Sequence, residues 1–183
     1  MEPRNAIDLA KSLQNEIAWS GFNQESLNEP DPDKEAFYEF VLDADLRSKT
    51  EKLFLDGHYA RAVEEAYKYI DNLVKKRVRK LCKASSGAKL MRTALSPNKP
   101  ILMLNENLTE VDVDEQQGYM DIFAGCKTGI RNPRAHDTDL NDDRDYALKL
   151  LSWADHLVSR IKNSKVNSGS KCDDFDDIPK QSK

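Results

Sequence analysis

The sequence YARAVEEAYKYIDNLVKKRVRKL, residues 59–81, decides the fold class of this chain. Its apolar side chains recur at steps of three and four residues over about six turns, which places them on one face of an α-helix. They are Tyr59, Ala62, Val63, Ala66, Tyr67, Ile70, Leu73, Val74, Val78 and Leu81. A stripe of this width has to be covered by other helices. We therefore expect an all-α fold in which further helices pack against this one.

Shorter helical stripes flank this segment on both sides. They cover residues 3–19, 33–41, 88–95, 114–130 and 146–161. Asp33 is the expected cap of the second of these helices. Residues 101–104 are apolar enough for extended structure, but four residues are too few to predict a strand. Only 7 glycines and 7 prolines are present, which also favours helices.

Composition and charge narrow the class of protein. The formal net charge of −4 argues against a surface that binds nucleic acid everywhere. The 3 cysteines are odd in number and far apart, so they indicate neither a disulfide framework nor a zinc site. No apolar run approaches the roughly 20 residues that span a membrane, and the first residues lack the layout of a secretory signal. We expect a cytoplasmic protein with no membrane contact, no cofactor and no bound metal.

The polar cluster GIRNPRAHD, residues 129–137, lies between two apolar helical segments. Pro133 lacks an N–H and disfavours the α region for the residue before it, so we expect the helix to end or bend at Asn132. The bare spacing of Arg131 and His136 is weak evidence. With 10 arginines and 3 histidines, such a pair arises by chance in roughly every second chain of this length. Capping of a helix end is the structural alternative.

The residue types nevertheless fit phosphodiester chemistry without a metal. Arg131 offers a planar donor fork suited to phosphate, and histidine exchanges protons near neutral pH. Asn132 is a candidate to bind phosphate or to position His136. Asp137 is a candidate to orient the imidazole, and the alternative is a turn cap. A basic run, in which Lys75, Arg79 and Lys83 fall four residues apart, predicts either an RNA footprint or a solvated helix face.

Four pieces of the chain, in order, resemble the HEPN superfamily and specifically its Ymh-type branch. They are residues 57–66 (GHYARAVEEA), 87–91 (GAKLM), 117–125 (QGYMDIFAG) and 130–136 (IRNPRAH). The resemblance implies an α-helical bundle that forms a homodimer with its two motif copies face to face. It implies a metal-independent endoribonuclease that acts as a toxin in antiviral defence. An antitoxin or another protein of a defence complex is then a candidate partner.

On this interpretation the catalytic residues are Arg131, Asn132 and His136. The RNA-binding residues are Arg134, Lys75, Arg79 and Lys83. HEPN proteins also occur as non-catalytic dimers, so the alternative is a scaffold or a nucleic-acid-binding regulator in a larger defence complex. Thr138 stands where toxins silenced by nucleotidylation carry a tyrosine, and the resemblance therefore does not extend to that mode of control. His58 is expected to cap a helix and His156 to lie exposed to solvent.

The expected organisation has three parts. Residues 1–41 form additional N-terminal helices, for which we expect packing or partner contacts only. Residues 42–163 form the HEPN-like domain. Residues 164–183 are rich in polar residues and in aspartate, and they contain too few apolar side chains to offset the entropy of ordering. We expect that segment to be a disordered acidic tail.

Overall fold

The computed structural model describes residues 31–78, 81, 86–137 and 139–170. This part of the chain is predominantly helical with one very small sheet, which confirms the all-α class. The chain divides into two compact units, Met1–Glu35 and Ala36–Lys183. Within the first unit, the carboxylate of Asp31 accepts hydrogen bonds from the amides of Asp33 and Lys34. Asp31 is therefore the cap that the sequence placed at Asp33, and α2 spans Pro32–Phe40.

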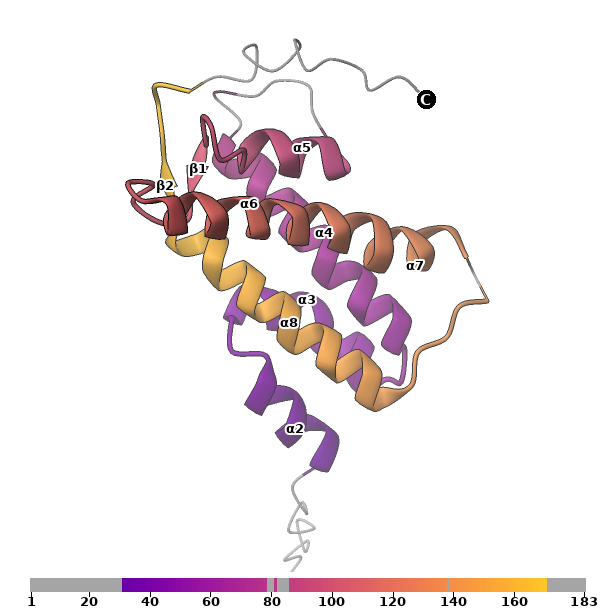
Figure 1. The fold of residues 1–183 in the computed structure, drawn as a ribbon. Helices are drawn as coiled ribbons and strands as arrows, with labels where there is room; N and C mark the ends of the chain where they lie inside the picture. The colour runs from indigo at the N-terminus through magenta and orange to yellow at the C-terminus, as the bar shows by residue number, and fades with distance from the viewer. Residues whose placement is uncertain (1–30, 79–80, 82–85, 138, 171–183) are drawn as a thin grey trace, which may run out of the picture. The chain divides into compact units, whose positions relative to one another are not determined.

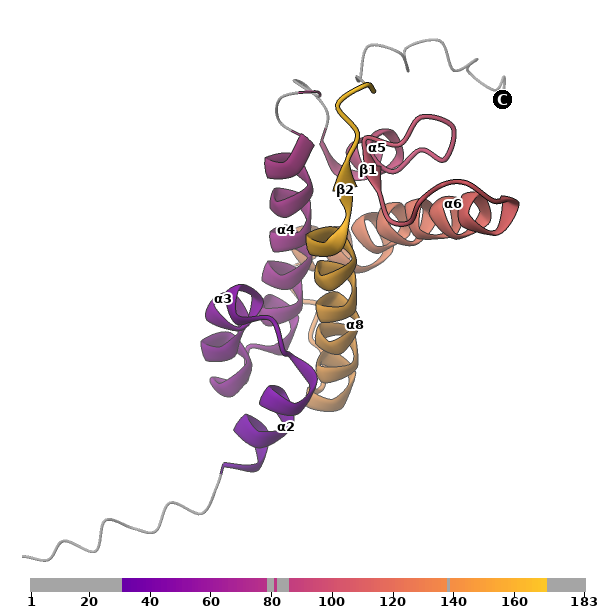
Figure 2. The same ribbon diagram turned by 90° about the vertical axis from the view of Figure 1, so that its left-hand side faces the viewer.

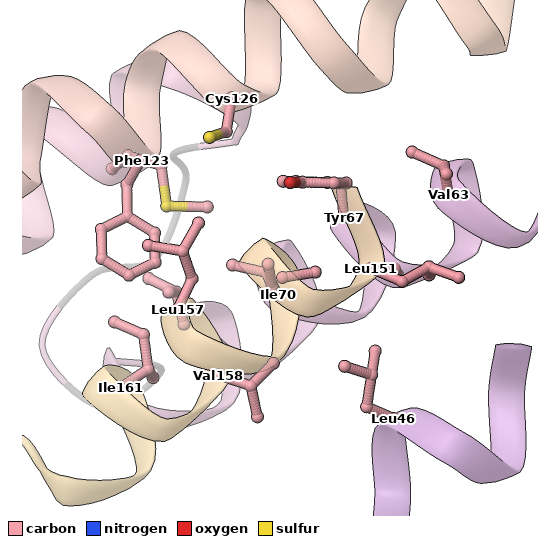
Figure 3. Close-up of a cluster of buried hydrophobic side chains, with 14 of the residues drawn as sticks. Leu46, Val63, Tyr67, Ile70, Phe123, Cys126, Leu151, Leu157, Val158 and Ile161 are labelled. Atoms are coloured by element: carbon pink, nitrogen blue, oxygen red, sulfur yellow. The ribbon is translucent and has the colours of Figure 1, made fainter. Parts of the chain in front are cut away.

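Helix α4, Tyr59–Val78, forms the centre of the second unit. It packs most extensively against α8, Arg144–Asn163, and against α3, Ala44–Leu55. A tight turn joins α3 to α4, and Gly57 occupies it with a φ of +78° that a side chain would resist. The expected stripe on α4 is buried, and it meets the inner faces of both neighbours. The core between these helices, shown in Figure 3, includes Leu46, Val63, Tyr67, Ile70, Phe123, Cys126, Leu151, Leu157, Val158 and Ile161.

Helices α4 and α8 run side by side in the same direction (Figures 1 and 2). Two hydrogen bonds fix that direction. The Tyr67 hydroxyl donates to the carbonyl of Leu150 at 3.1 Å, and Arg77 donates to the carbonyl of Lys162 at 3.3 Å. The second hydrogen bond lies further along both helices than the first, so the two helices run parallel. Burial raises the pKa of Tyr67, so this phenol remains a neutral donor.

Helices α5, Gly87–Ala94, and α6, Glu110–Gly125, pack together beside this core. Helix α6 begins four residues before the predicted position. Thr109 and Asp112 form a reciprocal capping box there, with Asp112 in the place that Glu or Gln usually holds. A buried glutamine, Gln116, joins α6 to the segment before it. Its amide group is held by Leu95, Leu102 and Leu104, at distances of 2.9 to 3.0 Å.

A two-residue strand, β1 (Leu102–Met103), pairs in antiparallel register with β2 (Lys165–Val166). The predicted boundary of the disordered tail at residue 164 is therefore too early. Ser164 and Ser170 are buried, and the Asn167 amide donates to the carbonyl of Ile101 at 2.9 Å. Backbone hydrogen bonds to a distant segment order this polar stretch.

Several predictions concern residues outside the described ranges. They include the helix over residues 3–19, the rest of the acidic tail from residue 171, Thr138, and the side chains of Arg79 and Lys83. Among the helices that the structure does describe, none is long and apolar enough to cross a membrane.

Gln116 provides a test of how the α5–β1–α6 region is held. We expect Gln116→Leu to lower the free energy of unfolding by about 2–4 kcal/mol, because two carbonyls and one amide lose their buried partner. Its neighbour Gln117 is half-buried and bonds only to Asp121 within the same helix. Gln117→Leu should change stability by about 0.5 kcal/mol or less. Urea titration measures both, and equal losses would contradict the assignment.

Candidate active site

The polar cluster GIRNPRAHD, residues 129–137, is the motif of this chain, and it lies on a helix that continues through Pro133. Helix α6 passes into a π-helix, Cys126–Arg131, which passes into α7, Asn132–His136 (Figure 1). Asn132 has φ −63° and ψ −43° and so stays in the α region, and the expected end or bend is a change from the π-helix to α7 at this residue. Pro133 sits in the first turn of α7, where an N–H would have no partner within that helix.

The change of helix type accommodates the proline. In a regular α-helix the Pro133 ring would meet the carbonyl of Gly129 and leave it without a donor. The wider π register avoids this, and the amide of Asn132 donates to the carbonyl of Lys127, five residues back. The Thr128 hydroxyl donates a hydrogen bond to the carbonyl of Gly125 at 3.1 Å. This bond stabilises that carbonyl where the helix changes from α to π register. π-Helical turns occur frequently at functional sites.

Arg134 is a structural residue. Its Nε and one terminal nitrogen each lie 2.7 Å from a carboxylate oxygen of Asp142, and its other terminal nitrogen donates to the carbonyl of Ile130 at 2.8 Å. The two side chains are only 6% and 5% exposed. The guanidinium also lies over the ring of Tyr146, 5.8 Å from its centroid. The sequence assigned Arg134 to RNA binding, but this guanidinium is buried and its donors are already occupied within the fold.

Arg131 differs from Arg134 although only three residues separate them. It is half-buried, and its side-chain partner is the carboxamide oxygen of Asn132, at 3.5 Å. Its Nε is buried without a hydrogen-bond partner among the described residues. Arg47, Arg77 and Arg160 also have buried, unpaired Nε atoms, but their terminal nitrogens hold a carbonyl or a carboxylate.

Two arginines remain without a firm partner among those that the structure describes. They are Arg131 in the motif and Arg61 in the first turn of α4. The guanidinium of Arg61 is exposed and makes no hydrogen bond or ion pair with a described residue. Among the described arginines, these two are the ones most available to an anion from outside the chain.

His136 ends α7 with an exposed side chain. Its imidazole makes no hydrogen bond or ion pair within the described part of the chain. Asn132 lies one helical turn before it, so the two side chains share one side of α7. The structure therefore brings Asn132 next to both Arg131 and His136. Arg131 and His136 themselves are five residues apart, which corresponds to about 140° around an α-helix.

Asp137 and the other two histidines have surroundings that differ from those of His136. The Asp137 carboxylate accepts the amide of Asp139 at 3.0 Å, which is the turn-cap alternative. The His58 carbonyl accepts a hydrogen bond from the amide of Ala62 in the first turn of α4, at 2.9 Å, while its imidazole is exposed. His156 lies 2.8 Å from the Tyr119 hydroxyl and stacks on Trp153. The expectation that His156 is exposed is confirmed, but the sequence did not indicate these aromatic contacts.

Only one residue of the predicted basic footprint can be placed. Lys75 lies 3.1 Å from a carboxylate oxygen of Asp71, and Lys127 approaches the same oxygen at 3.4 Å. Asp71 is buried, and its other oxygen has no partner among the described residues. Lys75 is therefore partly neutralised by its own helix. No group of three or more His, Cys, Asp or Glu side chains in the described ranges is arranged to hold a metal ion.

Aromatic side chains of α8 lie beside the motif-bearing helix. Trp153 is 39% exposed and hydrogen-bonds toward the Cys126 thiol, whose pKa is raised by burial despite that contact. Tyr146 is 49% exposed, and its ring lies against Arg134 as described above. The sequence predicted a helix over residues 146–161, which contains both aromatics, but not their contacts with Cys126 and Arg134.

A polar cavity of about 270 Å³ opens next to the motif, and the sequence did not predict it. Residues at the start of α4 form one wall, and residues that flank His136 and follow it form the other. The lining residues are Gly57, His58, Ala60, Arg61, Glu64, Arg134, Ala135, Asp137, Leu140 and Asn141. The signal that could have found it is the piece GHYARAVE, residues 57–64, which carries the resemblance and also supplies one wall.

The Arg134 assignment predicts a large effect on stability. We expect Arg134→Ala to lower the free energy of unfolding by about 3–5 kcal/mol, because Asp142 is left as a buried, unpaired charge. Arg92 provides the matched control, since its ion pair with Asp121 is more than half exposed on both sides. Arg92→Ala should lower stability by about 1 kcal/mol or less. Chemical denaturation measures both, and native stability in Arg134→Ala would contradict a structural role.

Comparison with known proteins identifies the family of this chain. Residues 41–161 match a family described as a protein of unknown function, Hypoth_ymh. Comparison with the curated proteins gave no match, and comparison with the solved structures gave none. The matched segment is more than half of the 183 residues and contains α3, the motif and nearly all of α8. The Ymh part of the predicted resemblance is thus confirmed, the wider link to HEPN proteins remains a prediction, and the chain belongs to the Hypoth_ymh family.

Proposed function

We propose that this protein is a metal-independent endoribonuclease of the HEPN type, active as a homodimer in the cytoplasm. RNA is its substrate, and toxicity or antiviral defence is the biological setting that fits. Arg131 stabilises the charge that develops on the phosphate, His136 transfers protons, and Asn132 holds one or both in place. A protein partner that restrains the activity, as an antitoxin does, belongs to the same proposal.

The availability of Arg131 and His136 carries this proposal. The donors of Arg134 are occupied by buried acceptors, whereas the guanidinium of Arg131 and the imidazole of His136 have no firm partner within the described ranges. A cation and a proton-transfer group on one exposed helix end are the two components that phosphodiester cleavage by an RNA 2′-OH requires. Asn132 lies between them and offers an amide for orientation.

The same geometry favours a site built from two chains. Cleavage needs one group to take the proton of the 2′-OH and another to protonate the leaving 5′ oxygen. One imidazole cannot do both in a single step. In one chain, moreover, Arg131 and His136 point in directions about 140° apart around the helix. Two copies of α7 facing each other across a two-fold axis supply two imidazoles and two guanidiniums to a single cleft.

Trp153 and Tyr146 support a contact between copies at this face. Both are large, partly exposed aromatic side chains beside the motif-bearing helix. Exposed aromatic patches of this kind mark association surfaces more often than free surface. A second copy that covers them would hold the two motifs near each other.

The first prediction of the proposal is a dimer. Sedimentation at micromolar concentration should give about 42 kDa, twice the 20.9 kDa of the chain. Trp153→Glu should shift the protein to the monomer, because it places a charge in the buried interface. Leu108 is 83% exposed near the start of α6 and serves as the control. Leu108→Glu should remain dimeric, and a monomeric wild-type protein would exclude the composite site.

The second prediction concerns catalysis. His136→Ala and Arg131→Ala should each lower the rate of RNA cleavage by roughly 100-fold or more, with thermal unfolding unchanged. Arg92→Ala, which removes only an exposed ion pair with Asp121, is the control and should keep the wild-type rate. EDTA should have no effect, and the products should end in a 2′,3′-cyclic phosphate. Cleavage that stops with EDTA would contradict the mechanism.

A mixing experiment tests whether one cleft needs both histidines. Wild-type protein is combined with increasing amounts of His136→Ala and allowed to exchange subunits. Activity should then fall with the square of the wild-type fraction, since only dimers with two intact chains are active. A linear decrease would mean that each chain works alone. RNA that is bound but not cut by the wild-type protein would favour the alternative, a nucleic-acid-binding regulator.

A further inference from the structure

The cavity beside the motif contains polar side chains that the fold does not use. His58, Arg61 and Glu64 line its α4 wall, and none of the three side chains makes a hydrogen bond or ion pair with a described residue. Arg134 lies in the opposite wall but is occupied by Asp142. Unpaired polar groups that converge on a concave site are the usual mark of a ligand pocket.

The size of the cavity limits the ligand. Pockets for drug-sized ligands usually measure roughly 300–1,000 Å³, so a cavity of about 270 Å³ suits a smaller group such as one heterocyclic base. The volume is too small for a folded peptide or for several nucleotides. A single flexible nucleotide of an RNA strand can place its base in such a site when it is unstacked.

The distribution of charge indicates what the ligand offers. Two carboxylates, Glu64 and Asp137, and the amide of Asn141 line the cavity. Carboxylates accept hydrogen bonds and repel phosphate, so the interior suits a neutral group that carries N–H donors. Arg61 and His58 are exposed, whereas Glu64 is half-buried. The exposed Arg61 guanidinium is therefore placed for a phosphate outside the cavity, while the Glu64 carboxylate is placed for the group that enters it.

The position of the cavity relates it to the motif. Ala135 and Asp137, the residues on either side of His136, both line it. A nucleotide whose base occupies the cavity would thus have its phosphate close to the end of α7. This step rests on the proposed ribonuclease function.

We propose that the cavity receives the base of the nucleotide next to the scissile phosphate and selects bases that present amino groups, through Glu64. Guanine suits it best, because its Watson–Crick edge places a ring N–H and an amino group side by side for one carboxylate. Adenine and cytosine present an amino group without that adjacent ring donor, and uracil presents only a ring N–H. Arg61 binds the phosphate of the same nucleotide. The cavity is therefore a specificity subsite of the enzyme.

Glu64→Gln tests the subsite, because it keeps the size of the side chain and removes the charged acceptor. Four single-stranded RNAs that differ at one nucleotide are cleaved by the wild-type protein and by the variant. We expect the wild type to prefer guanine over uracil by about 10-fold or more in kcat/KM, and Glu64→Gln to lose that preference. Glu65, which pairs with Lys68 and does not line the cavity, provides the matched control. Glu65→Gln should retain the wild-type preference.

Binding of guanosine and uridine 5′-monophosphates to the full chain separates this proposal from the proposed function. Calorimetry should show tighter binding of the guanosine nucleotide, lost in Glu64→Gln and weakened in Asn141→Ala, which changes the opposite wall. That result supports the subsite even if the protein cuts no RNA, in which case the ribonuclease proposal alone fails. Equal cleavage of all four RNAs, a preference that survives Glu64→Gln, or the absence of nucleotide binding would overturn the subsite.

Discussion

Burial of one long amphipathic helix is the constraint on which the rest of the structure depends. The apolar face of α4 is covered by α3 and α8, and the motif-bearing helix lies across it (Figure 1). Polar residues on the same helix then position the site. Asp71 binds Lys127 of the π-helix, and Arg61 and Glu64 form a wall of the cavity. The helix that organises the core therefore also fixes the register and surroundings of the motif.

The two arginines of the motif, Arg131 and Arg134, have opposite roles. Arg134 is buried in a bidentate ion pair with Asp142, which joins α7 to the connector that leads into α8. Removing either member of such a pair leaves an uncompensated charge, so the pair acts as a rigid anchor. Arg131, on the adjacent π-helical turn, has no such acceptor among the described residues. The anchor holds the helix in place, and the free guanidinium can then be presented in a fixed position.

How far the sequence could predict the structure depends on the range of the interaction. The spacing on α4 and α8 reports directly which face is buried, and both helices were predicted within a few residues. Pro133 signalled an irregularity but not that a π-helix would absorb it. The pairing of Arg134 with Asp142 and of β1 with β2 depends on segments brought together only by the tertiary fold. For the same reason the cavity was missed, since its two walls are about 70 residues apart along the chain.

The unpaired polar groups near the motif share one physical explanation. In the parts of the fold that give it stability, buried polar side chains are hydrogen-bonded, as Gln116 and Arg134 are. Near α7, Arg131, His136 and Glu64 have no firm partner in the part of the chain that the structure describes. An unpaired donor such as the buried Nε of Arg131 costs about 1–3 kcal/mol in the free protein. The partial burial that creates this cost also weakens screening by water, so a phosphate that reaches Arg131 is bound more strongly there than on an open surface. The cost to stability in the free protein and the proposed affinity for an anion thus have the same physical origin.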